Sequence, residues 1–247
     1  MDKSQWTVSS KPTSDFFLEI AKWNIAWHRG ATLTGDDNAI GTTEVTVWGI
    51  WGRYQFQTTV VAMEILSDDA NDTSAWTWAR TVLVEWLDIN YAIQTETVTL
   101  NWVTPVALAS NYLRINDMHV STAWSWGVNV GTVTLRTVTG SVAQYSMLPW
   151  SNVWLTAVYT IPAWKTGYLL QYSITVEKWQ DAVISVYRKP NWLFTRRLDI
   201  PVYQNTADRT LAIPQPLPAQ TDLEVTAVST NAGTSLFLQL LILLIDD

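Results

Sequence analysis

The sequence contains no cysteine and only two histidines, His28 and His119. The absence of cysteine excludes disulfide bonds and thiolate chemistry, and neither histidine has a second ligand at a metal-like spacing, which argues against a zinc or haem site. The sequence also lacks a P-loop, a GxSxG nucleophile motif and a dinucleotide fingerprint. We therefore expect no catalytic, cofactor-binding or metal-binding residues, and a protein that is not an enzyme.

Charged residues are also scarce, at 15% of the chain against about a quarter in typical globular proteins. Depletion of charge is a feature of surfaces that other subunits cover. The formal net charge of −7 argues against nucleic acid as a partner. No apolar run is long enough to span a bilayer, and the N-terminus lacks the apolar core of a signal peptide, so we expect no membrane association. The most apolar run, SLFLQLLILLI near the C-terminus, is predicted to be a buried strand.

The remaining pattern indicates an all-β protein. Short runs rich in Val, Ile, Thr, Tyr and Leu recur roughly every ten residues and are separated by Pro, Asn, Lys or Gly, as in antiparallel β domains. About seven strands fit before the interruption at Met147–Asn152 and about seven fit after it, enough for two sandwiches. We predict an N-terminal arm over residues 1–42, followed by jelly-roll-like β-sandwich domains over 43–148 and 149–247. Residues 28–43 are expected to form a loop that leads from the arm into the first domain.

Two groups of residues are candidates for contacts between subunits. Phe16, Phe17 and Ile20 follow a potential helix cap at Asp15 with helical spacing, so a short helix in the arm could dock on a neighbouring subunit or fold back on its own domain. Four cations flank the predicted turn at Pro190-Asn191, where they could meet an acidic partner surface or simply be solvated. They are Arg188, Lys189, Arg196 and Arg197.

An acidic segment contains Asp68, Asp69, Asn71 and Asp72. Its oxygens could serve Ca²⁺, but the spacing does not match an EF-hand loop, which needs a Gly and a distal Glu. Asp and Asn are standard turn residues, so a solvated acidic turn is the favoured interpretation.

The sequence has 16 tryptophans but only 10 glycines. Several tryptophans stand where a turn would use glycine: Asn101-Trp102 and Asn191-Trp192 occupy places typical of Asn-Gly hairpin turns. One interpretation is an assembly protein that buries its tryptophans at interfaces. The other is a decoding ambiguity, because UGA is read as glycine in some genetic codes and as tryptophan in others. Trp48, within an extended run, has the context of a true tryptophan.

Several blocks of the sequence resemble a family of virion structural proteins of tailed bacteriophages, over roughly residues 15–247. The blocks are DFFLEIAKWNIAWH, the central EILSDDANDTSAWTWARTVLVEWLDINYAIQTETVTLNWVTPV, and, in the C-terminal half, IPAWKTGYLL, KWQDAVISVYRKPNWLF and TDLEVTAVSTNAGTS with the ending LLILLIDD. The sequence departs from the family-like pattern by carrying Trp in place of Gly at positions 76, 78, 86, 102, 164, 179 and 192.

The resemblance implies a non-enzymatic particle component that is assembled in the host cytoplasm and resides in the virion. Its implied partners are other copies of itself and other virion proteins, such as the major capsid or tail proteins. A capsid-decorating or head-associated homo-oligomer is the leading expectation. A tail or neck component, and a receptor- or glycan-binding module of a fibre, are the alternatives.

Overall fold

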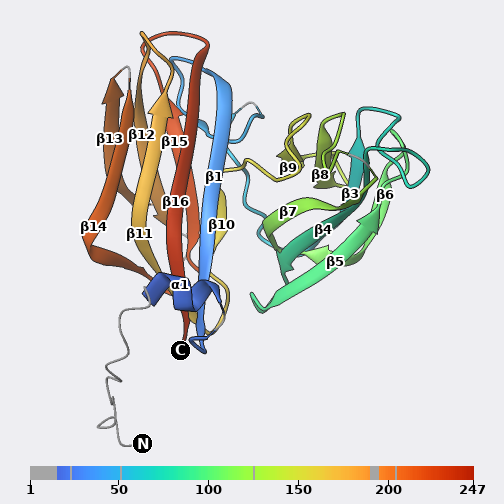
Figure 1. Cartoon of the computed structure of the whole chain (residues 1–247), viewed down its shortest axis with the longest axis horizontal. Coiled ribbons are helices and arrows are strands. Elements are labelled where there is room, and N and C mark those ends of the chain that lie inside the picture. Colours follow the sequence, from blue (N-terminus) through green and yellow to red (C-terminus); the bar gives the residue numbers. More distant parts are fainter. Residues whose placement is uncertain (1–15, 23, 51, 125, 190–194, 204) are drawn as a thin grey trace, which may run out of the picture.

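The computed structural model describes residues 16–247 except for 23, 51, 125, 190–194 and 204. The described residues form one short helix, α1 (Phe16–Ala21), and sixteen strands, which confirms the all-β prediction (Figure 1). The strands are β1 (His28–Ile40), β2 (Val45–Thr46), β3 (Val61–Ser67), β4 (Ala79–Leu87), β5 (Ile93–Thr99), β6 (Val106–Tyr112), β7 (Arg114–Ala123), β8 (Val133–Thr137), β9 (Ala143–Met147), β10 (Val158–Thr160), β11 (Lys165–Val176), β12 (Asp181–Lys189), β13 (Thr195–Tyr203), β14 (Thr206–Leu217), β15 (Asp222–Val228) and β16 (Thr234–Asp246).

The described strands make four antiparallel sheets. Their orders are β1-β16-β11-β14, then β10-β15-β12-β13 with β2 added beside β15, then β6-β3-β8-β9, and finally β5-β4-β7. Figure 1 shows β3–β9 on one side and β1 with β10–β16 on the other. One continuous cluster of buried apolar side chains draws on all four sheets, so the described strands do not divide clearly into the two predicted sandwich domains.

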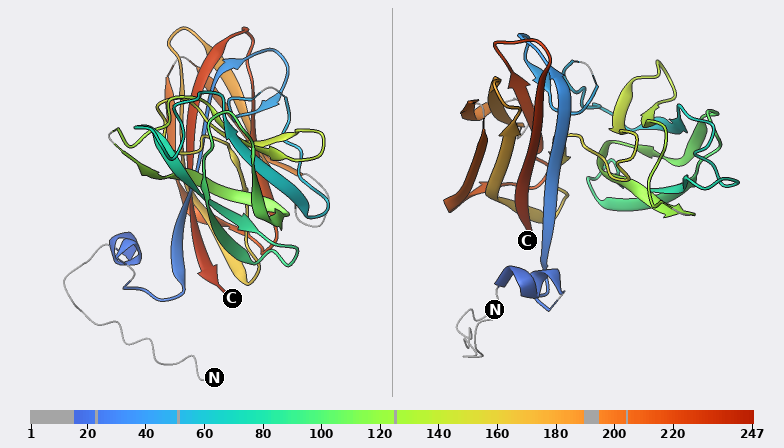
Figure 2. Two further views of the ribbon diagram at one scale, coloured as in Figure 1. Left: turned by 90° about the vertical axis from the view of Figure 1, so that its right-hand side faces the viewer. Right: turned by 45° about the horizontal axis from the view of Figure 1, so that its top comes forward.

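The expectation that residues 28–43 form a loop is wrong for most of the segment. Residues 28–40 form β1, which pairs with β16 from His28↔Ile245 to Asp37↔Leu236. The segment contains Gly35, Asp36 and Asp37, residues that favour turns, and its pairing with an apolar strand overrides that local preference. Much of the predicted arm therefore belongs to the C-terminal group of sheets (Figure 2).

The C-terminal apolar run forms β16, as predicted. It lies between β1 and β11, so neither of its backbone edges is open. Its buried side chains follow the two-residue period of a strand whose one face points into a core: Leu236, Leu238, Leu240, Ile242 and Leu244. Full burial of a leucine side chain contributes about 1.5–3 kcal/mol, which makes this strand a main source of stability.

Polar contacts between β7 and β10 join the two groups of sheets. The Asn116 side chain donates to the carbonyl of Thr160 (2.8 Å) and accepts from its backbone amide (3.0 Å). Both residues are buried, and the two hydrogen bonds give the amide and the carbonyl of Thr160 a partner in β7. Hydrogen bonds as well as apolar packing therefore fix the position of the two groups of sheets relative to each other.

Candidate interaction surfaces

Helix α1 lies on the sheet that contains β1, β11 and β16 (Figure 1). Ile20 is buried there against Leu170 and Leu243, so this part of the predicted contact set folds back on its own chain. Phe16 and Phe17, one helical turn earlier, are each about half exposed (47% and 49%). The helix thus uses one apolar side chain as an anchor and leaves two aromatic rings accessible.

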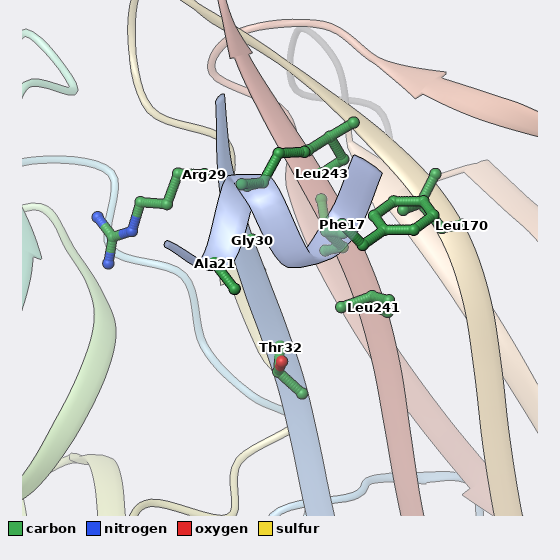
Figure 3. A pocket seen from close by; sticks show the side chains of 10 residues that line it. Phe17, Ala21, Arg29, Gly30, Thr32, Leu170, Leu241 and Leu243 are labelled. Carbon is green, nitrogen blue, oxygen red and sulfur yellow. The ribbon is translucent and has the colours of Figure 1, made fainter. Parts of the chain in front are cut away.

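An open hollow of about 340 Å³ lies between α1 and the sheet. Figure 3 shows Phe17, Leu170, Leu241 and Leu243 around it, with the Arg29 guanidinium directed away from the helix. That guanidinium binds the Glu85 carboxylate on β4 instead, with Nη2–Oε2 at 2.8 Å. The hollow is therefore lined mainly by apolar groups and suits an apolar side chain.

The predicted cationic cluster lies at the paired ends of β12 and β13. Arg196 binds the Asp199 carboxylate (Nε–Oδ1 2.5 Å) and donates to Ser185 Oγ (2.6 Å), and the hydrogen bond and charge of Asp199 raise the pKa of Arg196. Arg188 donates to the Pro216 carbonyl at 3.3 Å, and Lys189 Nζ lies 6.0 Å from the Phe56 ring centroid. These three cations are engaged within the fold.

Two parts of that prediction lie outside the described residues: the Pro190-Asn191 turn and the side chain of Arg197. The backbone of Arg197 is part of β13. The pairing of Tyr187 with Arg196 confirms that β12 and β13 are antiparallel neighbours.

The acidic segment at 68–72 is not simply solvated, because Asp72 is fully buried. Its carboxylate accepts from Ser67 Oγ (2.7 Å) and from the amides of Val130 (3.0 Å) and Gly131 (2.9 Å). The Asp72 carboxylate thereby links the end of β3, at Ser67, to the loop that precedes β8, at Val130 and Gly131. The prediction of a solvated turn is wrong for this residue, which satisfies buried backbone donors instead.

Neither histidine belongs to a catalytic or metal-like constellation in the described part of the chain. His28 Nδ1 contacts the Ala26 carbonyl (2.9 Å), and His119 Nδ1 contacts Asp117 Oδ2 (3.1 Å). Among the described residues no group of three or more His, Asp or Glu side chains could hold a metal ion.

An aromatic cluster has no signature in the sequence, because its members come from three separate loops. Trp78 stacks with Trp126 at a centroid distance of 6.3 Å and meets Trp150 edge-on at 4.7 Å. Trp126 and Trp150 are exposed, as are the nearby Trp76 and Trp124 in the same loops. A surface of this kind offers flat apolar faces on which a sugar ring can stack.

No family model and no curated protein matches the chain. Among solved structures, "Structure of infectious bursal disease virus Gt strain" is 11% identical over 89% of this chain and 76% of that chain, with a TM-score of 0.18. A TM-score this low supports no conclusion about fold or function. No helix in the described part of the chain has the length and hydrophobicity that crossing a membrane requires.

Proposed function

We propose that this chain is a non-enzymatic structural component of a tailed-phage virion, and more narrowly a capsid-decorating or head-associated protein. It acts by packing against other copies of itself and against other virion proteins. The resemblance of residues 15–247 to tailed-phage virion proteins supports this proposal, as does the low charge content of the chain. The two groups of sheets serve, in this proposal, as two jelly-roll-like packing units.

One observation carries the proposal: Phe16, Phe17 and Leu18 are each about half exposed, and Phe17 also lines the apolar hollow. Complete burial of such a side chain contributes about 1.5–3 kcal/mol, so the uncovered half of each represents a sizeable driving force for association. Ile20 holds the helix on the sheet, so these side chains are presented from a fixed position. A second copy of the chain is the occupant that we propose for this surface.

A tail or neck component would use the same packing chemistry at another place in the particle. A glycan-binding fibre module is a second candidate, which the exposed cluster around Trp78 and Trp126 favours. The two classes differ in where binding energy comes from: an apolar helix surface for assembly, and stacked indole rings for a sugar.

The test compares two variants of the full chain in reconstituted particles. Phe16→Ser with Phe17→Ser removes the two half-exposed rings, whereas Ile213→Ser removes an apolar side chain that is more exposed still, at 84%, on the edge strand β14. We expect the first variant to lose particle occupancy and self-association while remaining folded, and the control to bind at the stoichiometry of the parent. Equal occupancy by both variants contradicts a packing role for α1.

The isolated parent protein separates the two classes. A decorating protein copurifies with intact heads at a stoichiometry that matches lattice sites and does not bind host cells. Binding of the isolated chain to host-cell glycans, without incorporation into heads, would replace our proposal with the fibre module.

A further inference from the structure

Tryptophan is strongly over-represented among residues with a left-handed backbone. Of the nine described non-glycine residues with positive φ, five are tryptophans: Trp27, Trp102, Trp150, Trp164 and Trp179. Tryptophan makes up only 16 of the 247 residues of the chain. A bulky residue in this region of φ is strained, and glycine occupies it freely.

The turn at Leu148–Ser151 shows the requirement most directly. The Ser151 amide donates to the Leu148 carbonyl (3.3 Å), with Pro149 second and Trp150 third in the turn. Trp150 has φ of 66°, and Pro149 precedes it with the negative φ of its ring. This is a type II turn, in which the third position demands φ above zero and is normally glycine or asparagine.

The hairpin turn between β11 and β12 has the same form. The Gln180 amide donates to the Glu177 carbonyl (3.2 Å), and the third residue, Trp179, has φ of 69°. Lys178, in the second position, does not have a positive φ. This is again a type II pattern with tryptophan in the glycine position.

In the turn at Asn101–Thr104 the residue with positive φ is the second of the turn and not the third. The Thr104 amide donates to the Asn101 carbonyl (3.0 Å), and the second residue, Trp102, has φ of 55°. Val103 does not have a positive φ, so the turn is of type II′, whose second position is a glycine position.

Packing does not compensate for this strain. The five side chains are between 50% exposed, for Trp102, and 81% exposed, for Trp164. Trp48 and Trp154 behave differently: both are buried and neither has a positive φ. The indole of Trp48 also donates to the Gly52 carbonyl (3.3 Å) and packs edge-on against Tyr54. The chain thus contains tryptophans that are built into the core and others that lie on turns shaped for glycine.

We infer that residues 27, 102, 150, 164 and 179 are glycine in the protein as its host makes it. The decoding step that accounts for this is a UGA codon read by a glycyl-tRNA rather than a tryptophanyl-tRNA. The protein's production therefore depends on a host whose translation assigns UGA to glycine. This inference does not rest on the proposed function, because it follows from backbone geometry alone. It does bear on the fibre alternative, since the aromatic cluster would lose Trp150.

Mass spectrometry of the chain isolated from its native source tests the inference. Trypsin releases residues 179–188 as one peptide, WQDAVISVYR, in which position 179 is the N-terminal residue. We expect this peptide to begin with glycine and to be lighter by the mass difference between the two residues. The tryptic peptide of residues 137–165 carries positions 150, 154 and 164, and fragmentation reads each one separately.

Glycine at 150, 164 and 179, with tryptophan retained at the buried position 154, is the expected result. Tryptophan at 150 and 179, in the chain from the native source, overturns the inference. Sequencing of the gene from the same source provides the companion readout: the expected codon is UGA at the glycine positions and UGG at position 154, and UGG throughout overturns the inference equally.

Discussion

Arg114 on β7 and Asp222 on β15 form a buried, bidentate ion pair that joins the two groups of sheets. Arg114 Nε lies 2.8 Å from Asp222 Oδ1, and Nη2 lies 2.9 Å from Oδ2. Thr160 Oγ1 also donates to Asp222 Oδ1 (2.7 Å). Burial by itself lowers the pKa of Arg114, but the hydrogen bonds and charge of Asp222 outweigh that effect and raise it. The guanidinium therefore stays charged in a site from which water is largely excluded.

Removing one partner of this pair leaves an uncompensated buried charge. We expect Asp222→Ala to lower the free energy of unfolding by about 3–5 kcal/mol, measured by urea denaturation. Asp199→Ala removes a single arginine contact at a site where both side chains are about half exposed, and the expected loss is about 0–1 kcal/mol. Similar losses in the two variants would show that the Arg114 contact does not hold the sheets together.

Adjacent residues on β16 point to opposite faces and allow a matched core test. Leu238 is fully buried, whereas its neighbour Phe237 is 44% exposed. Leu238→Ala is expected to cost about 2–5 kcal/mol through lost burial and a residual cavity. Phe237→Ala removes more atoms from a half-exposed position and should cost clearly less. A larger loss for Phe237→Ala in denaturant titrations would contradict the assigned register of β16.

The contrast between β16 and β1 shows how far sequence reasoning reaches. The leucines of β16 recur with a period of two, and this pattern predicts a buried strand. β1 carries Gly30, Gly35, Asp36 and Asp37, which individually favour turns, and only its partner β16 makes it a strand. A pairing between the two ends of a chain leaves no local signature, so the segment is misread as loop.

The candidate surfaces divide in the same way. Helical spacing predicts that Phe16, Phe17 and Ile20 share a face, but which of them the sheet covers depends on Leu170 and Leu243, far along the chain. Arg114 and Asp222 are 108 residues apart, and no sequence pattern around either residue predicts that they pair. Turn chemistry, by contrast, is local, which is why the unusual tryptophans can be recognised from the amino-acid order alone.

Asp36 and Asp37 on β1 should make stability depend on pH. Burial raises the pKa of both carboxyls, and at Asp37 the hydrogen bond from the Ala39 amide (2.8 Å) opposes the rise while the charge of Asp36 adds to it. Because the folded state holds these protons more tightly than the unfolded state, their contribution to stability is greatest below the ordinary aspartate pKa of 3.8. It is lost as the pH rises through their folded-state pKa values.

Asp36→Asn with Asp37→Asn removes this dependence, and the amide oxygen introduced at position 37 can still accept from Ala39. We expect the double variant to gain stability relative to the parent as the pH is raised from about 4 to 7, with urea midpoints as the measurement. Asp208→Asn, at an exposed position on β14, serves as the control. A stability difference that stays constant over this range would rule out the proposed role of burial.

Trp179 and Trp124 provide the sharpest test of backbone strain, because the two side chains are matched. Each is 72% exposed, and each lies beside a cation, Lys178 Nζ at 5.1 Å from the Trp179 ring and Arg80 Cζ at 5.6 Å from the Trp124 ring. Only Trp179 has a positive φ. Replacing either tryptophan by glycine therefore removes a similar exposed cation–π contact, but only one replacement relieves a left-handed conformation.

Relief of that conformation stabilises the fold by about 1–2 kcal/mol. At both positions the lost cation–π contact lowers stability by about 0.5–1 kcal/mol. Glycine lowers it further by about 0.4–1 kcal/mol, because it gives the unfolded chain more conformational freedom. These effects nearly cancel at position 179, so Trp179→Gly should leave the melting temperature close to that of the parent. Trp124→Gly has no strain to relieve and should lower it. Calorimetry of the two variants beside the parent measures the difference directly, and equal falls would show that position 179 has no preference for glycine.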